Sequence, residues 1–102
     1  EKELFVTVPV IVAYYCDLEE IERLAVEAGS ETAEAIPGAV RSFSPCVRFQ
    51  KLGQFGISLN VVFKVEEFND QFVIRDEFIR RFHRLTRERG VEWASMPRNV
   101  PA

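Results

Sequence analysis

The sequence predicts an α+β domain whose elements follow in the order β-α-β-β-α-β. Three observations support this order. Apolar and polar residues alternate in strand-like runs, two longer segments carry apolar residues at helical spacing, and a short glycine-containing link joins the two middle strands. The order is that of a ferredoxin-like fold, with two helices on one face of a small mixed sheet. A chain of 102 residues is the size of one domain, so we assign residues 1–102 to a single unit.

The first strand is expected between residues 4 and 15, where almost every residue is β-branched or aromatic. From Val10 onward the run is continuously apolar, which is typical of a strand buried on both faces. Pro9 lacks a backbone N–H donor. The part of the strand before it is therefore predicted to lie at an edge, at a bulge or in a connecting segment.

The first helix is predicted to begin after Asp17. Its carboxylate can accept a hydrogen bond from the backbone N–H of Glu20, and the Glu20 side chain can reach back, as in a capping box. Gly29 is a plausible end, although the helix can continue to Ala35, and residues 36–38 (Ile-Pro-Gly) break it. One apolar stripe recurs at helical spacing: Leu18, Ile21, Leu24, Ala25 and Ala28.

Two strands are predicted next, over residues 46–52 and 57–65. The second alternates apolar and polar side chains over nine residues, which is the clearest period-two pattern in the chain. The link between them is short and contains Gly53 and Gly56, so the two strands are expected to pair as a hairpin.

A polar turn over residues 66–71 leads into a second helix that runs to about Arg89. Gly90 supplies its end, residues 91–93 (Val-Glu-Trp) are predicted as a short last strand, and residues 95–102 as an extended, proline-containing tail. The apolar face of this helix consists of Ile74, Phe78, Ile79, Phe82 and Leu85.

Charge argues against a nucleic-acid-binding protein. The net charge is −3 and the pI is near 5.2, whereas phosphate recognition needs a basic surface. The charge is uneven: residues 1–40 carry nine acids and two bases (−7), and residues 41–102 carry seven acids and eleven bases (+4). The arginines of the second helix therefore form either a solvated face or a contact with an acidic neighbour, such as a copy of the first helix.

The residue types that carry chemistry are sparse. His83 is the only histidine, and Cys16 and Cys46 lack the spacing of a zinc site, so we read the cysteines as small buried residues that stay reduced. Asp17 serves better as a helix cap than as a metal ligand. We interpret Glu19 and its acidic neighbours as a solvated helix face rather than as a cation site. We therefore expect no enzyme, no cofactor, no metal site and no catalytic residue.

Three strings resemble one known family. Residues 12–21 (VAYYCDLEEI) resemble the start of the C-terminal α/β domain of small-conductance mechanosensitive ion channels. Residues 47–53 (VRFQKLG), continued by residues 57–61 (ISLNV), look like the hairpin of that domain. The segment of residues 78–93 is similar to its last helix, glycine end and short strand. The tail departs from the family, which commonly ends in a string of hydrophobic residue, proline, aromatic residue and proline. Here Trp93 is followed by a single proline before residue 98.

The resemblance implies a domain of the cytoplasmic cage of a multi-pass cell-membrane channel, on the cytoplasmic side. Such a channel is a homo-oligomer that releases ions and small solutes when hypo-osmotic stress raises membrane tension. Because the chain starts at Glu1 and its only methionine is Met96, we expect it to be a fragment or a processed product. The resemblance implies that membrane helices and a β domain lie upstream, through which the subunits assemble. No nucleic acid takes part. The candidate structural or interface residues are Asp17, Gly53, Gly56, Gly90, Trp93 and Pro97.

A second hypothesis comes from a different class of protein. A soluble regulatory module of ferredoxin-like fold, binding a small molecule at a subunit interface, is compatible with the same order of elements. The sequence upstream of Glu1 discriminates between the two, because only the channel requires apolar spans there.

Overall fold

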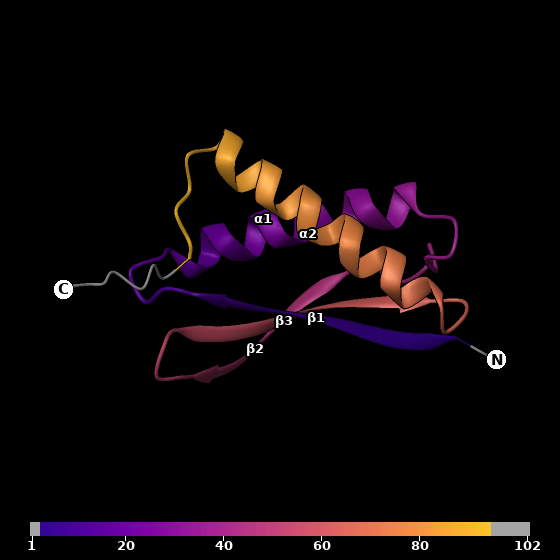
Figure 1. Cartoon of the computed structure of the whole chain (residues 1–102), viewed down its shortest axis with the longest axis horizontal. Coiled ribbons are helices and arrows are strands. Elements are labelled where there is room, and N and C mark those ends of the chain that lie inside the picture. The colour runs from indigo at the N-terminus through magenta and orange to yellow at the C-terminus, as the bar shows by residue number, and fades with distance from the viewer. Residues whose placement is uncertain (1–2, 95–102) are drawn as a thin grey trace.

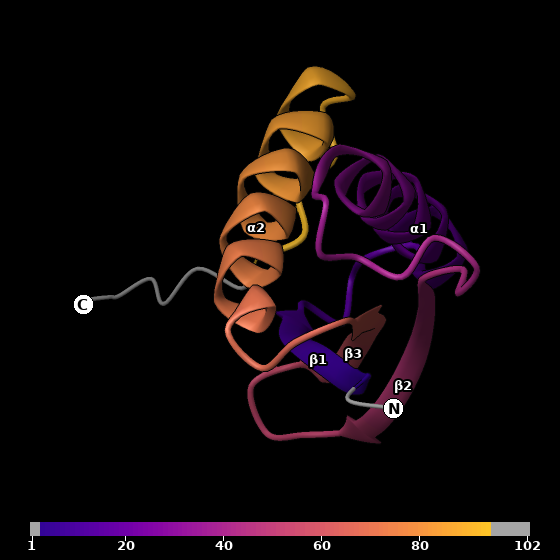
Figure 2. The same ribbon diagram turned by 90° about the vertical axis from the view of Figure 1, so that its right-hand side faces the viewer.

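The computed structural model describes residues 3–94 as a two-layer α+β domain, with both helices on one face of a sheet (Figures 1 and 2). This arrangement confirms the predicted α+β class and the placement of both helices on one face. The elements in chain order are β1 (Leu4–Val12), α1 (Leu18–Ala35), β2 (Cys46–Leu52), β3 (Ile57–Val65) and α2 (Asp70–Glu88).

The sheet has three strands in the order β1-β3-β2, and both neighbouring pairs are antiparallel. The expected mixed sheet is therefore wrong. The two middle strands have the predicted bounds and pair as a hairpin, with a bulge between Phe49 and Lys51. The predicted last strand, residues 91–93, is absent, so the described chain has the order β-α-β-β-α and lacks the fourth strand of a ferredoxin-like fold.

The end of α2 explains why residues 91–93 form no strand. Gly90 has φ 68°, and its N–H donates to the carbonyl of Arg87 (3.2 Å), while the N–H of Val91 donates to the carbonyl of Thr86 (2.9 Å). This pair of bonds is a Schellman motif, which reverses the chain at a helix end. The indole N–H of Trp93 also donates to the Thr86 hydroxyl (3.1 Å). The last turn of α2 therefore holds this segment.

Strand β1 is an edge strand, which is one of the three placements that Pro9 left open. Only one of its faces is buried: the side chains of Val6, Val8 and Val12 point into the core, whereas Ile11 is 55% exposed. The expectation of burial on both faces is wrong because the helices form one layer only, and no described segment covers the other face of the sheet (Figure 2).

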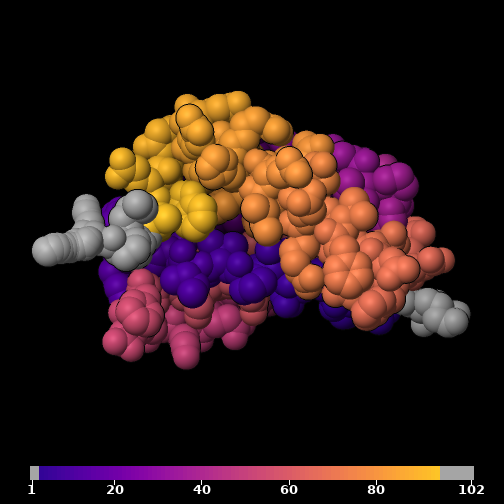
Figure 3. Space-filling view, viewed as in Figure 1, coloured from indigo at the N-terminus to yellow at the C-terminus, as the bar shows by residue number. Residues whose placement is uncertain are grey.

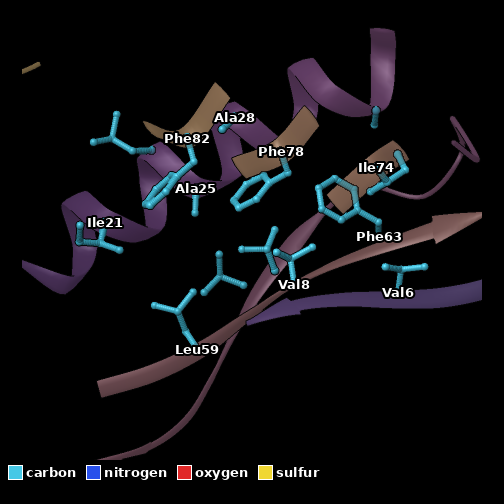
Figure 4. Packing of buried hydrophobic residues seen from close by; sticks show 14 of the residues in the cluster. Val6, Val8, Ile21, Ala25, Ala28, Leu59, Phe63, Ile74, Phe78 and Phe82 are labelled. Carbon is cyan, nitrogen blue, oxygen red and sulfur yellow. The ribbon is translucent and has the colours of Figure 1, made fainter. Parts of the chain in front are cut away.

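The core lies between the sheet and the two helices (Figure 4). Small residues of α1, among them Ala25, Ala28 and Gly29, lie against aromatic residues from the sheet and α2. A Cβ on Gly29 would lie 3.1 Å from the Cβ of Pro45, so the glycine serves close packing in the middle of the helix rather than ending it. The ring of Phe63 meets Phe78 edge-on.

The predicted apolar faces of both helices are confirmed with one exception, since Ile79 of α2 is 55% exposed.

Ion pairs between the two helices explain part of the charge asymmetry. Arg81 Nη1 lies 3.6 Å from a Glu31 carboxylate oxygen, and Arg89 Nη2 lies 3.0 Å from one of Glu27. The acidic neighbour of the basic helix is thus, in part, the first helix of the same chain.

Candidate functional site

The loop between β1 and α1, residues 13–17, is the point where three separate parts of the chain meet. We call it the junction loop. The N–H of Cys16 donates to the carbonyl of Ala13 (3.1 Å), which folds the loop into a tight turn. Each of its five residues makes a specific hydrogen bond, and four of these residues bond to segments that are distant in sequence.

Asp17 joins the loop to α1. Its side chain accepts hydrogen bonds from the backbone N–H groups of Glu19 (3.0 Å) and Glu20 (3.3 Å). The predicted N-cap is confirmed, and it satisfies two of the N–H groups that lack partners at a helix start. The reciprocal bond from the Glu20 side chain is not among the hydrogen bonds of the described residues.

Tyr14 joins the loop to the β2–β3 hairpin. Its hydroxyl donates to the carbonyl of Gly53, and the N–H of Gly53 donates to the carbonyl of Gly56 (2.8 Å), which closes the link. Gly56 has φ 155°, and a Cβ there would lie 2.5 Å from the carbonyl oxygen of Val12. Only glycine therefore fits at this close approach between the hairpin and β1.

Three contacts join the loop to residues 92–94. The N–H of Ala13 donates to the carbonyl of Trp93 (2.7 Å), the Tyr15 hydroxyl donates to the carbonyl of Ala94 (3.0 Å), and the Cys16 thiol donates to the carbonyl of Glu92 (3.3 Å). Burial raises the pKa of the Cys16 thiol, and the negative charge of Glu20 raises it further. The raised pKa agrees with a protonated thiol that donates to these carbonyls.

The junction loop brings together four of the six residues singled out from the sequence. Asp17 belongs to it, Gly53 and Trp93 bond to it, and Gly56 lies against the last residue of β1. Gly90 lies apart from the loop, where it reverses the chain after α2. Pro97, like the rest of the predicted tail at residues 95–102, lies outside the described residues.

Sequence reasoning did not find the roles of Tyr14, Tyr15 and Cys16. The available signal was two tyrosines directly after a strand, since tyrosine combines an apolar ring with a hydroxyl that finds a partner. Neither hydroxyl bonds locally: the partner of Tyr14 is 39 residues away, and that of Tyr15 is 79 residues away.

Two hollows flank the segment of residues 91–94. The first, which we call the edge groove, lies between the free edge of β1 and α2 and has a volume of about 300 Å³. In Figure 3, α2 is seen above β1 on the side facing the viewer. The edge groove is lined by Pro9, Val10, Ile11, Phe78, Ile79, Phe82, His83 and Trp93. The second hollow, of about 500 Å³, is lined by Tyr15, His83, Thr86, Arg87, Val91, Glu92, Trp93 and Ala94.

Over residues 3–94, no group of three or more histidine, cysteine or acidic residues is placed to hold a metal ion. His83 is exposed at the rim of both hollows. Neither α1 nor α2 is long and apolar enough to cross a membrane.

In the comparisons with known proteins, no protein-family model matches the chain and no curated protein is similar to it.

Proposed function

We propose that this chain is the cytoplasmic α/β domain of a small-conductance mechanosensitive ion channel. In this role it forms part of the cage below the pore, through which ions and small solutes leave under hypo-osmotic tension. The observation that carries the proposal is the string VAYYCD of residues 12–17. It resembles the family's string at the start of this domain, and it contains the whole junction loop.

The physical demand on a cage wall supports the proposal. A wall that excludes large molecules must hold its shape while solute flows past it. The junction loop ties the hairpin, the start of α1 and the segment after α2 to the end of β1. The second resembling string, residues 47–53, ends at Gly53, the residue that accepts the bond from Tyr14. The third string, residues 78–93, also reaches the loop, because the carbonyl of Trp93 accepts from the N–H of Ala13. All three strings thus meet at the junction loop.

The open reading frame around residues 1–102 gives the first test. The proposal requires at least two apolar spans of about 20 residues upstream. A last span rich in Gly and Ala is also required, because closely packed pore helices need small residues. Lys and Arg should be enriched in the loops on the side of this domain. An upstream sequence with no apolar span within about 150 residues, one typical domain, would overturn the proposal.

Survival of osmotic downshock gives the functional test. We expect the full-length protein to protect a bacterial strain that lacks its own mechanosensitive channels, because an open channel releases solute before the cell lyses. Residues 1–102 expressed alone are the matched control and should give no protection. A full-length protein that reaches the membrane and gives no protection would contradict the proposal.

The second hollow supports the alternative function, a regulatory module that binds a small molecule. Tyr15 and Trp93 offer aromatic rings, while Arg87 and His83 offer donors, a combination suited to an aromatic anion. A screen of small aromatic carboxylates by thermal unfolding tests it. A saturable rise in the unfolding temperature that is lost in Arg87→Gln would favour the module, and no rise with any of the compounds would exclude this ligand class.

A further inference from the structure

The link between β2 and β3 carries the two most exposed large apolar side chains of the described residues. We call residues 51–56 the hairpin tip. Leu52 is 76% exposed and Phe55 is 74% exposed. The tip forms one end of the sheet, on the side away from the layer of helices (Figure 1). Because large apolar side chains exposed close together mark a contact surface, the tip is a candidate for binding.

Hydrogen bonds inside the protein hold the tip in shape. The N–H of Gly53 donates to the carbonyl of Gly56 (2.8 Å), and the Tyr14 hydroxyl donates to the carbonyl of Gly53. The Ser58 hydroxyl donates to the carbonyl of Lys51 (3.5 Å). Three carbonyls of the tip therefore have a partner within the chain. An unpaired backbone group is costly to bring into hydrocarbon, so this pairing favours entry of the tip into an apolar medium.

Two residues beside the apolar side chains suit a boundary between lipid and water. Tyr14 joins an aromatic ring to a hydroxyl, a combination that is enriched at this boundary. Lys51 directly precedes Leu52, and a lysine can bury its stem along apolar surface while its ammonium group stays in water. Lys51 and Phe55 line one hollow of about 280 Å³, and the described residues that line it include no acid. The tip therefore fits a surface that is apolar inside and negatively charged outside.

A lipid surface matches the tip better than a pocket in a protein does. The tip displays two large side chains three residues apart, and a fluid interface accepts both without a complementary shape. The net charge of −3 does not oppose this contact strongly. At physiological ionic strength, charges more than about 8 Å from the membrane surface are largely screened. The charge of Lys51 acts at close range, because this residue lies next to the side chains that would enter the lipid.

We infer that the hairpin tip inserts Leu52 and Phe55 into the surface of a membrane that contains anionic lipid, with Lys51 at the headgroups. A single myristoyl chain binds membranes with a constant of about 10⁴ M⁻¹. Two side chains bury less apolar surface than that chain, so we expect a binding constant of roughly 10³ M⁻¹. The inference does not depend on the channel proposal, since a soluble module with this tip would bind lipid in the same way.

Co-sedimentation with vesicles tests the contact. Residues 1–102 are mixed with vesicles of phosphatidylcholine containing about 30% phosphatidylserine, at lipid concentrations up to about 10 mM. Leu52→Ser and Phe55→Ser should each weaken binding about tenfold, because each removes one inserted side chain. Phe68→Ser, which removes a ring that is 63% exposed at the start of α2, should leave binding unchanged.

Three outcomes of this experiment would overturn the inference. The first is no binding of the unmodified chain at the highest lipid concentration. The second is an equal effect of Phe55→Ser and Phe68→Ser. The third is a chain that does not bind vesicles but loses self-association, or binding to a protein, in Phe55→Ser, because the tip would then belong to a contact between proteins.

The contribution of Lys51 is measured by comparing two lipid compositions. Lys51→Gln should weaken binding to vesicles with phosphatidylserine about fivefold and leave binding to pure phosphatidylcholine unchanged. Arg84→Gln removes an exposed cation of α2 and should change neither. Equal losses from these two variants would contradict an orientation in which the tip faces the lipid.

Photo-crosslinking shows which side chain enters the lipid. Phe55 is replaced by p-benzoylphenylalanine, and in a second protein Phe68 is replaced in the same way. We expect adducts with lipid acyl chains from position 55 and none from position 68. Adducts from both positions or from neither would overturn the inference, while the channel proposal would still stand on its own tests.

Discussion

Truncation of Phe82 tests how the segment after α2 is held. The Phe82 side chain is 3% exposed, stacks on Phe78 with ring centroids 5.5 Å apart, and lies 5.2 Å from the ring of Trp93. Removing a buried phenylalanine ring typically costs about 3–5 kcal/mol. Because Phe82 also lines the edge groove, part of the cavity left by Phe82→Ala opens to solvent and can take up water. We therefore expect the lower part of this range, about 3 kcal/mol.

Urea unfolding followed by tryptophan fluorescence measures this effect, since Trp93 is the only tryptophan. For a domain of this size, a loss of about 3 kcal/mol corresponds to a fall in Tm of about 12–24 °C. The folded variant should also show red-shifted emission, because Trp93 loses the ring on which it packs. Phe68→Ala, an exposed phenylalanine at the other end of α2, should cost less than about 1 kcal/mol. A loss below about 1 kcal/mol for Phe82→Ala would refute the packing of α2 described above.

Four further predictions concern the junction loop and the helix ends. Gly56→Ala should destabilise by about 2–4 kcal/mol in urea melts, because its Cβ clashes with the Val12 carbonyl; a loss below about 1 kcal/mol would refute that close approach. Gly90→Ala meets no neighbouring atom and should cost only about 1 kcal/mol of backbone strain, so a loss as large as that of Gly56→Ala would be inconsistent. Asp17→Ala should cost about 1 kcal/mol and Asp17→Asn much less; equal losses would argue against the cap. The raised pKa of Cys16 predicts that its thiol reacts slowly with a disulfide reagent at pH 8, measured in Cys46→Ala protein so that only Cys16 reacts. The reaction rate should rise only above the ordinary thiol pKa, and a rate at pH 8 equal to that of a model thiol would contradict the prediction.

Local sequence patterns predicted the elements that depend on interactions between residues close together in the chain. The alternation over residues 57–65 predicted β3 to the residue, because one face of that strand is buried along its whole length. Asp17 and Gly90 predicted helix ends, since capping depends on groups within a few residues. These features would be recognised in any chain that carried the same short strings.

The missed features depend on partners distant in sequence. Ile79 lies on the predicted apolar stripe of α2, but the spacing of a helix does not reveal that the sheet ends at β1. Residues 91–93 have strand-forming side chains, yet the hydrogen bonds at Thr86 hold them against the helix end. The hydroxyls of Tyr14 and Tyr15 bond to carbonyls on opposite sides of the junction loop, which only the folded chain brings together.

Single-channel recording on the full-length protein tests the proposed function most directly. The protein is inserted into a membrane, and current is recorded while suction on the patch raises tension. The proposal predicts steps of current whose open probability rises with tension and which are absent from patches without the protein. Full-length protein that is demonstrably in the membrane and passes no tension-dependent current would contradict the assignment of this domain to a mechanosensitive channel.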